Sequence, residues 1–480
     1  MPKRDRWAER ADALLGATLN EIFLKIPPAE ARALFRRVAK EAEKARLLYE
    51  DDDGTSRVIP LMIRPRVIRP EQEQYFRKTC LEVTRAIEKL AKLYVDDPRV
   101  RALLPFTERE ERWLRDIWTK VARQPQTVVA RLDANTDFAV TDWDKQFHFF
   151  ETNSVGVGGM YYAPTAAAIV HRQVVPAMHR QAPALVLKPQ DDMRQLLLEQ
   201  ITTHARAIRK RRINTAFVQD KSHKGGPTEF PFLVEYFESQ GIPARHVDPL
   251  ELTQKGDELW AGDMPVDIVY RDAEIGEYID YEDEGHDVSA LKAAFARNQV
   301  VSSLAGEFDH KSTFEVLTSP ELAGHFTRAQ RKIFRRHVLW TRIVRDTRTT
   351  GPDDEPIDLL PWLRRNKDRV VLKPNRAFGG TGIVVGPHAD LAAWDAALAE
   401  ALHEDAAETG GVVAQRYVDV RVKDFPVLAP DGSGICLEEF YVVCGFLATP
   451  RGVGILGRAS KKRVVNVGQQ GGLTAVLVLV

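Results

Sequence analysis

A lysine that precedes a glycine-rich turn is the clearest chemical feature of this 480-residue chain. The apolar residues 370–372 lead to Lys373, and the turn after it leads to a second apolar run at 383–385. The glycines of this turn are Gly379, Gly380 and Gly382. Because glycine has no side chain, backbone N–H groups in such a turn can approach phosphate oxygens closely. The pattern predicts a β-hairpin flap that grips a nucleotide phosphate, with an ordinary tight turn as the alternative.

The order of these residues differs from that of a Walker phosphate loop. In a Walker loop the lysine follows the glycines and opens a helix. Here Lys373 comes first, and the chain contains no Gly-Lys-Ser/Thr sequence. The hairpin is therefore a different kind of phosphate site.

Oxygen-bearing side chains occur together far upstream of the hairpin. Asp133 is followed by a strand-like segment that contains Glu151 and Asn153. We expect a turn at 142–145 between them. Residues two apart on a strand share a face, so Glu151 and Asn153 project together while Phe150 and Thr152 point the other way. Carboxylate and amide oxygens suit Mg²⁺, which predicts a metal site at Glu151 with Asp133 and Asn153 as helpers. The alternative is a solvent-facing strand with ordinary charges.

The order of these motifs resembles that of circularly permuted ATP-grasp proteins, and most of all the glutathionylspermidine synthase-like branch. Arg131-x-Asp133 comes first, then Glu151-x-Asn153, then a later lysine, then the Lys-Pro and glycine flap. Ordinary ATP-grasp chains place the magnesium-binding strands last, whereas here they precede Lys373. The resemblance covers about residues 126–480 in motif order. It implies an α/β (α+β) ATP-grasp fold with an N-terminal helical region and a small α/β layer domain.

The resemblance also implies roles for individual residues. The implied ATP-binding residues are Lys311, Lys373, Gly379, Gly380, Gly382 and the adenine hinge residues Gln415, Tyr417 and Val418. The implied magnesium ligands are Asp133, Glu151 and Asn153. The implied catalytic arginines are Arg131 and Arg458. Arg458 is similar to the late arginine that reaches the transferred phosphate, although a solvated basic cluster with its neighbours 461–463 is the alternative. A plain strand end is the alternative for the hinge. Arg271 closes an apparent strand at 266–270 and stays outside the predicted site, because an ordinary surface arginine fits the pattern equally well.

Composition narrows the class of protein. Lysine plus arginine equals aspartate plus glutamate at 68 each, so no broad positive field favours nucleic acid as a partner. No segment approaches the roughly 20 consecutive apolar residues of a membrane span, and the N-terminus lacks an apolar core, so we expect a soluble cytoplasmic protein without a membrane partner. The three cysteines are too few and too scattered for a disulfide framework, and we expect buried thiols.

Four regions are predicted along the chain. They are an N-terminal helical region (1–125), the permuted metal-binding strands (126–170), a small α/β domain (171–305) and the nucleotide-binding region (306–480). The apolar residues Phe76, Cys80, Val83, Ile87, Leu90 and Tyr94 predict one helix face that packs into its own domain. We expect 58–70 to be a connector and the acidic run 274–287 to be a solvated loop, which could instead attract a cationic amine. Strands are expected at 215–219, 244–248, 412–417, 435–443 and 474–480, and helices at 230–240 and 391–402.

The chemistry implied by the resemblance is ATP-dependent ligation of a carboxylate to an amine, which forms an amide or peptide bond through an acyl phosphate. ATP and Mg²⁺ are the implied cofactors, and the partners are carboxylate and amine small molecules or peptides. The segment at 154–159 differs from the threonine-bearing continuation associated with glutathione binding, so a peptide, an amino acid or another metabolite remains open as the acid. Two other classes remain open: a small-molecule kinase with the same nucleotide grip, and a nucleotide-binding protein without catalysis.

Overall fold

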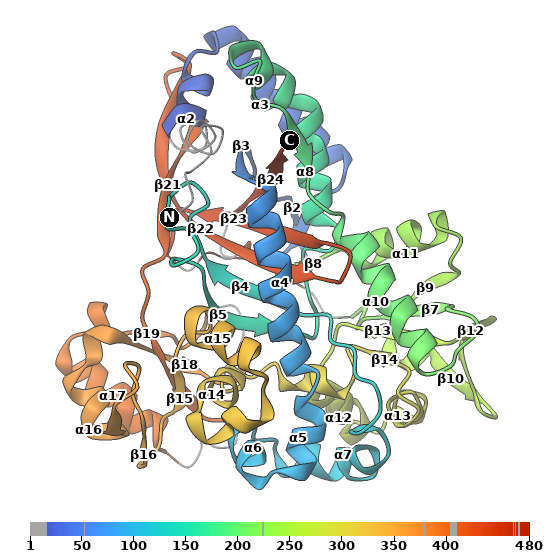
Figure 1. Ribbon diagram of the computed structural model, residues 1–480. Helices are drawn as coiled ribbons and strands as arrows, with labels where there is room; N and C mark the ends of the chain where they lie inside the picture. Colours follow the sequence, from blue (N-terminus) through green and yellow to red (C-terminus); the bar gives the residue numbers. More distant parts are fainter. Residues whose placement is uncertain are drawn as a thin grey trace.

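Strands from both ends of the chain meet in the central sheet of the molecule (Figure 1). The computed structural model describes residues 17–51, 53–222, 225–377, 380–403, 410–463, 465, 467–468 and 471–480. The central sheet has the order β3-β24-β23-β22-β4-β5, with β21 beside β22 and β6 beside β24. Its strands are β3 (Leu61–Ile68), β4 (Arg131–Asn135), β5 (His148–Asn153), β6 (Leu187–Pro189), β21 (Arg421–Leu428), β22 (Ile435–Ala448), β23 (Val453–Ser460) and β24 (Gly472–Leu479). Neighbouring strands are antiparallel except β3 and β24, which are parallel.

Helices cover both faces of this sheet, because its strands carry apolar side chains on each face. Val476 and Val478 of β24 share a core with α4 (Pro70–Ile87), whereas Ala475 and Leu477 share another with α8 (Tyr162–Gln173). Successive residues of a strand point to opposite faces, so α4 and α8 lie on opposite sides. The other helices around this sheet are α2 (Ala17–Leu24), α3 (Pro28–Lys44), α9 (Val175–Gln181) and α10 (Met193–Ala207).

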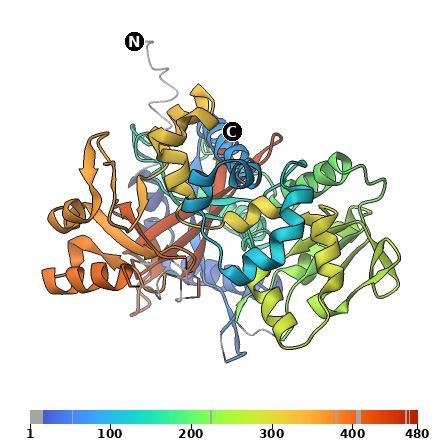
Figure 2. The ribbon, with the colours of Figure 1, turned by 90° about the horizontal axis from the view of Figure 1, so that it is seen from below.

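Two smaller sheets flank the central one on either side (Figure 2). An antiparallel sheet has the order β15 (Thr341–Ile343), β20 (Val412–Arg416), β18 (Val370–Pro374), β19 (Val384–Val385), and it packs with α16 (Leu359–Arg365) and α17 (Leu391–Ala401) around the buried Trp394. A parallel sheet has the order β14 (Val300–Val301), β13 (Ile268–Arg271), β7 (Thr215–Val218), β9 (Ala244–Val247). It packs with α11 (Phe230–Ser239), α12 (Ile275–Asp283) and α13 (Ser289–Ala296).

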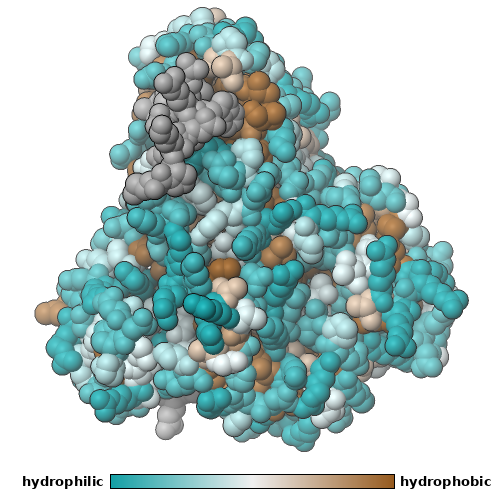
Figure 3. Space-filling view, viewed as in Figure 1, coloured by the Kyte–Doolittle hydropathy of each residue, from teal (hydrophilic) through white to brown (hydrophobic). Residues whose placement is uncertain are grey.

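The remaining elements are β1 (Leu48–Glu50), β2 (Ser56–Val58), β8 (Gly226–Pro227), β10 (Leu252–Lys255), β11 (Glu258–Ala261), β12 (Met264–Val266), β16 (Arg348–Thr350), β17 (Pro356–Asp358), α5 (Leu90–Asp96), α6 (Pro98–Leu103), α7 (Glu108–Val121), α14 (Thr313–Thr318), α15 (Arg328–His337) and five short 3₁₀ turns. Their strands form three further small sheets in the part of the chain that the structure describes, with the orders β2-β1-β8, β10-β11-β12 and β16-β17. Polar residues predominate on the face of the molecule in Figure 3. Among the described residues, no helix combines the length and the apolar character that crossing a membrane requires.

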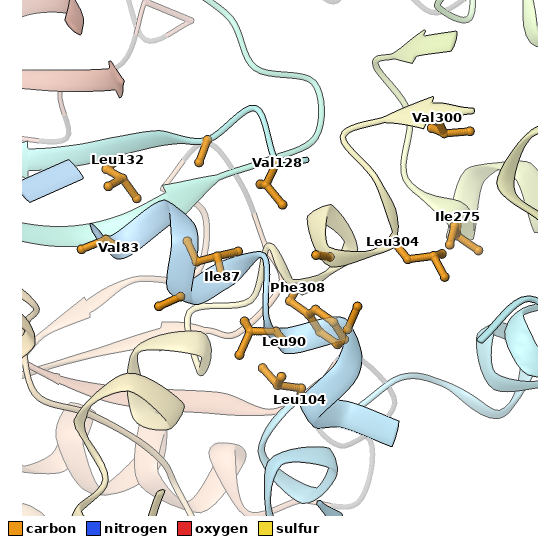
Figure 4. Packing of buried hydrophobic residues seen from close by; sticks show 14 of the residues in the cluster. Val83, Ile87, Leu90, Leu104, Val128, Leu132, Ile275, Val300, Leu304 and Phe308 are labelled. Atoms are coloured by element: carbon orange, nitrogen blue, oxygen red, sulfur yellow. The ribbon is translucent and has the colours of Figure 1, made fainter. Parts of the chain in front are cut away.

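The predicted apolar helix face is buried, but it belongs to two helices. Helix α4 ends at Ile87, and α5 begins at Leu90. Figure 4 shows Val83, Ile87 and Leu90 along this face, packed near Leu104 and Phe308. The core extends from there to Val300 and Ile275 beside the parallel sheet, so these two helices join the parts of the molecule. Cys80 and Cys444 are buried free thiols, as expected, and Cys436 is partly buried.

The prediction of a connector at 58–70 is wrong, because residues 61–68 form strand β3 of the central sheet. Its two arginines and Pro65 obscure the strand pattern. Strand β3 lies at the end of the sheet order, where a proline without an N–H group is tolerated.

The prediction of a solvated loop at 274–287 is also wrong for most of its length, because residues 275–283 form helix α12. Ile275, Tyr278 and Ile279 have helical spacing and are buried. The Glu274 and Glu277 side chains form a capping box at the start of this helix. The acidic residues thus form the exposed side of an amphipathic helix.

Candidate functional site

A cavity of about 400 Å³ lies between the central sheet and the antiparallel sheet that carries Lys373. The predicted site residues that line it are Glu151, Lys373, Gly380, Gln415, Tyr417, Val418 and Arg458. Arg131, Asp133, Asn153, Lys311 and Gly382 are not in its wall, and Gly379 lies outside the described residues. Seven of the predicted site residues, which come from different strands and strand ends, therefore meet at one cavity.

The register of the central sheet places the predicted metal and catalytic residues on one face. Asp133 is opposite Glu151 and Arg131 is opposite Asn153 across β4 and β5. On the other side of Asp133 lies Gly445 of β22, and Val443 of the same strand is opposite Arg458. Directly paired residues share a face, so these side chains project toward the antiparallel sheet.

Two arginines hold the buried carboxylate of Asp133. Arg131 Nε donates to Asp133 Oδ1 at 2.7 Å and its Nη2 to Oδ2 at 3.0 Å, while Arg458 Nη2 donates to Oδ2 at 2.6 Å. Burial alone would raise the pKa of Asp133, but Arg131 and Arg458 lower it below its ordinary value. Gly445 provides the space, because a Cβ at this position would lie 2.5 Å from Asp133 Oδ1. In this arrangement Asp133 orients the two arginines.

Glu151 and Asn153 fit the donor set of a magnesium site. Glu151 is half-buried in the cavity wall, and the Asn153 amide donates to the Arg131 carbonyl at 3.4 Å, which turns its Oδ1 away from that strand. One carboxylate and one amide oxygen leave the other positions of Mg²⁺ to water and phosphate. Among the described residues, no cluster of three or more histidine, cysteine or acidic side chains is placed to bind a metal.

The predicted orientation of Phe150 is wrong. The register between β4 and β5 shifts after Asp133, so that Glu151 is opposite Asp133 and Phe149 is opposite Ala134. This irregularity leaves Phe150 without an opposite residue, and strict alternation fails there. Phe150 therefore lines the cavity together with Glu151, and the Lys373 ammonium lies 5.2 Å from the centre of its ring.

Lys373 is a buried cation on the opposite wall of the cavity. Its ammonium donates to Gln415 Oε1 at 2.8 Å. Gln415 Nε2 in turn donates to the Phe150 carbonyl and to Thr341 Oγ1, each at 3.0 Å. Burial lowers the pKa of Lys373 to about 8, an effect opposed by Glu151 and strengthened by Lys311. Gln415 thus positions the lysine and ties the antiparallel sheet to β5.

The lowered pKa predicts a pH-dependent affinity for ATP. A bound phosphate favours the charged lysine, so above a pH of about 8 binding must be accompanied by proton uptake. We expect the dissociation constant of ATP, measured by calorimetry, to rise by up to about tenfold per pH unit above that value. The Lys373→Arg variant should lose this dependence, because arginine stays protonated. An equally steep rise in that variant would assign the effect to another group.

Lys311 and Asn375 fix the base of the glycine flap. The Lys311 ammonium donates to the Ala377 carbonyl at 2.7 Å, and its backbone N–H donates to the Asn375 carbonyl at 3.0 Å. Asn375 Oδ1 accepts from the Ser312 N–H at 2.8 Å. Gly380 and Gly382 have positive φ angles of 82° and 68°, which favour glycine. Lys311 therefore holds the flap in this structure, and its ammonium lies near enough to Lys373 to influence that lysine's pKa.

Apolar side chains also line the cavity. They are Leu339, Val371, Ile383, Val385, Val418 and Val443. The segment at 416–418 is anchored by its backbone, because the Arg416 N–H donates to the Trp340 carbonyl and the Tyr417 N–H to the Arg369 carbonyl, each at 2.8 Å. The Tyr417 hydroxyl donates to Asp419 Oδ1 at 2.5 Å, and burial followed by this hydrogen bond raises the pKa of Tyr417 to about 12.

Two buried carboxylates that the sequence did not reveal hold the segment after Asn153. Asp309 Oδ2 accepts from the Ser154 N–H at 2.6 Å, and Glu229 accepts from the N–H groups of Gly159, Tyr161 and Tyr162. Burial raises the pKa of each to about 7. Arg131 Nη1 donates to the Gly158 carbonyl at 2.8 Å, so this segment lies directly beside the arginine pair. Their partners are 67 or more positions away in sequence, which leaves no local signal.

Arg271 is buried, so the interpretation of an ordinary surface charge is wrong. It forms an ion pair with Glu307, and both side chains are essentially inaccessible to solvent. We expect Arg271→Met to lower the free energy of unfolding, measured with urea, by about 3–5 kcal/mol, because it leaves Glu307 buried and unpaired. The double variant Arg271→Met/Glu307→Gln should recover part of that loss, and equal stability of the single variant and the parent would contradict this assignment.

Comparisons with known proteins indicate the fold. No protein-family model matches the chain, and no curated protein matches it in sequence. Among solved structures, the chain is similar to a glutathione synthetase-like effector from Globodera pallida in its apo form, with a TM-score of 0.60 and 12% sequence identity. The similarity covers 95% of this chain and 98% of that chain. At this identity the likeness concerns the fold alone, and the chain shares the mixed α/β fold of that structure.

Proposed function

We propose that this protein is an ATP-dependent carboxylate–amine ligase that forms an amide or peptide bond through an acyl phosphate. The observation that supports this most directly is the single cavity between two sheets, with Glu151 and Arg458 on one wall and Lys373 on the other. Oxygen atoms that can bind a metal ion lie on one wall and a buried cation lies on the other. This arrangement suits a nucleoside triphosphate, whose phosphates and transferred phosphoryl group require positive charge around them. The glutathione synthetase-like fold is consistent with this chemistry.

The apolar side chains of the cavity wall would hold the adenine ring, with the hinge at 415–418 beside it. The ammonium of Lys373 would neutralise phosphate charge, and backbone donors around Gly380 would close over the phosphates and exclude water. Magnesium held by Glu151 and Asn153 would supply charge neutralisation for the phosphate oxygens. Binding of the nucleotide is therefore assigned to the antiparallel sheet and to β5.

The arginine pair would act on the reacting groups. Arg458 would stabilise the phosphoryl group during transfer, and Arg131 would orient the carboxylate or the acyl phosphate through its planar fork. Asp133 fixes the positions of both guanidinium groups before substrate arrives. Phosphorylation turns a carboxylate oxygen into a good leaving group, and the amine then displaces phosphate.

The domain arrangement in this proposal is that of a circularly permuted ATP-grasp protein of the glutathionylspermidine synthase-like branch. The strands within 126–170 and the region 306–480 would form the ATP-binding unit, with 171–305 as the small α/β domain and 1–125 as an N-terminal region. The order of Glu151 and Asn153 before Lys373 supports this arrangement.

Trapping of the activated acid tests the proposed function. The protein is incubated with Mg-ATP, hydroxylamine and pools of amino acids and short peptides, and both ADP and hydroxamates are measured by mass spectrometry. The proposal predicts a hydroxamate that depends on one carboxylate and forms together with ADP. ADP with a phosphorylated alcohol and no hydroxamate would indicate a kinase instead.

A further inference from the structure

A second cavity, of about 340 Å³, lies where helix α2 packs near strands β3 and β21. Arg66 in its wall donates to Cys444 Sγ at 2.9 Å. Cys444 follows Val443, which lines the nucleotide cavity, and successive residues of a strand point to opposite faces. Arg66 therefore meets β22 on the face opposite to Val443, whereas Val422 borders both cavities.

Two buried guanidinium groups in this wall have no carboxylate partner. Arg64 is 7% exposed and Arg66 is 6% exposed, and among the described residues neither forms an ion pair. Arg66 Nη2 donates to the Thr136 carbonyl at 2.8 Å, so it has neutral partners. Arg64 Nη1 makes one long hydrogen bond, to the Asp424 carbonyl at 3.4 Å, the guanidinium lies 5.4 Å from the centre of the Phe425 ring, and Nε has no acceptor among the described residues. A buried charge without a counter-ion is unfavourable, which indicates that an anion completes the site.

The acidic residues that border the cavity equal its basic residues in number, but among the described residues none of them forms an ion pair with Arg64 or Arg66. Asp137 is already paired with Lys423. Asp424 and Glu439 also border the cavity, but both residues are exposed, where water screens their charges. Burial, followed by the nearby Arg66, lowers the pKa of Arg64 to about 10, which leaves it protonated at neutral pH.

The cavity also contains an acceptor that lacks a donor. Asn20 Nδ2 donates to the Asp424 carbonyl at 3.2 Å, whereas the buried Oδ1 of Asn20 has no partner. Unsatisfied donor and acceptor atoms in one wall call for a ligand that carries both an anionic acceptor and a donor. Apolar surface from Leu19, Val67 and Phe138 lies between these polar groups.

We propose that this second cavity binds a small carboxylate that also carries a hydrogen-bond donor, the chemistry of an α-amino acid. The carboxylate would accept from the guanidinium groups of Arg64 and Arg66, whose planar geometry matches it, and the ammonium would donate to Asn20 Oδ1. A volume of about 340 Å³ accommodates a ligand of this size. The described walls of the two cavities share Val422, and the proposed site does not depend on the proposed ligase activity.

Calorimetric titration of the full chain with each common amino acid, without nucleotide, tests the site. At least one amino acid should bind, and its uncharged carboxamide should bind at least about tenfold more weakly, because it lacks the carboxylate charge. Arg64→Gln should abolish binding of that amino acid and leave the dissociation constant of ATP unchanged. The matched control is Arg36→Gln on the exposed side of α3, which should bind as the parent does.

Asn20→Leu provides an independent variant if Arg64→Gln does not fold. It should weaken binding of the amino acid by about tenfold, because it removes the Oδ1 acceptor of the ammonium. It should not change binding of the corresponding acid without the amino group, which has no ammonium to donate. The proposal is overturned if no amino acid binds, if Arg64→Gln or Asn20→Leu binds as the parent does, or if inorganic phosphate binds as tightly as the best amino acid.

Discussion

Replacing Glu151 by glutamine is expected to lower kcat by on the order of 100-fold or more while the affinity for ATP changes little. The amide keeps the size of the side chain and one oxygen donor, but it removes the negative charge from the wall of the nucleotide cavity. Metal-assisted charge stabilisation is needed most when the phosphoryl group is in transit, so the loss falls on turnover. Steady-state kinetics of ADP formation, with the acid identified by hydroxamate trapping, measure the effect.

Glu400→Gln is the matched control, because Glu400 is an exposed residue of α17 outside the cavity wall. This variant should keep the parent's kcat. If Glu151→Gln also keeps it, Glu151 is not a metal ligand in the reaction and the metal site must be sought elsewhere.

Lys373→Met is expected to weaken ATP binding by roughly 30- to 150-fold, which corresponds to the loss of about 2–3 kcal/mol from one charge-assisted interaction with phosphate. Methionine has a similar length and no charge, so the variant removes the ammonium while it fills the space beside Phe150. Calorimetric titration with Mg-ATP measures the dissociation constant.

Thermal unfolding separates this effect from a general loss of structure. Removing the buried ammonium relieves its desolvation, but it also leaves the buried Gln415 Oε1 without its donor, so we expect a small change in melting temperature and a cooperative transition in Lys373→Met. Lys332→Met, on the exposed side of α15, should bind ATP as the parent does. Parent-like ATP affinity in Lys373→Met would show that the glycine flap is not the phosphate site.

Local patterns in the sequence were sufficient to predict one part of this site. The alternation of side chains places Glu151 and Asn153 together, and the hairpin after Lys373 has the expected strands β18 and β19. The same rule failed at Phe150, because a register shift between two strands depends on the partner strand and leaves no mark on a single segment.

Contacts between distant residues could not be predicted in this way. Asp133 and Arg458 are 325 positions apart, and only the order of strands in the central sheet brings them together. Strand β3 was missed for a related reason, since Arg64 and Arg66 look like exposed residues until β21 and α2 are placed beside them. The burial and the partners of such side chains are known only once the tertiary structure is known.

The transfer of oxygen from the acid to phosphate tests the central proposal most directly. The acid identified by hydroxamate trapping is labelled with heavy oxygen in its carboxylate and incubated with Mg-ATP, the protein and an amine, and the released phosphate is examined by mass spectrometry. An acyl phosphate passes one carboxylate oxygen to phosphate when the amine attacks. We therefore expect one labelled oxygen atom in each phosphate released. Unlabelled phosphate, formed together with the amide, would contradict it.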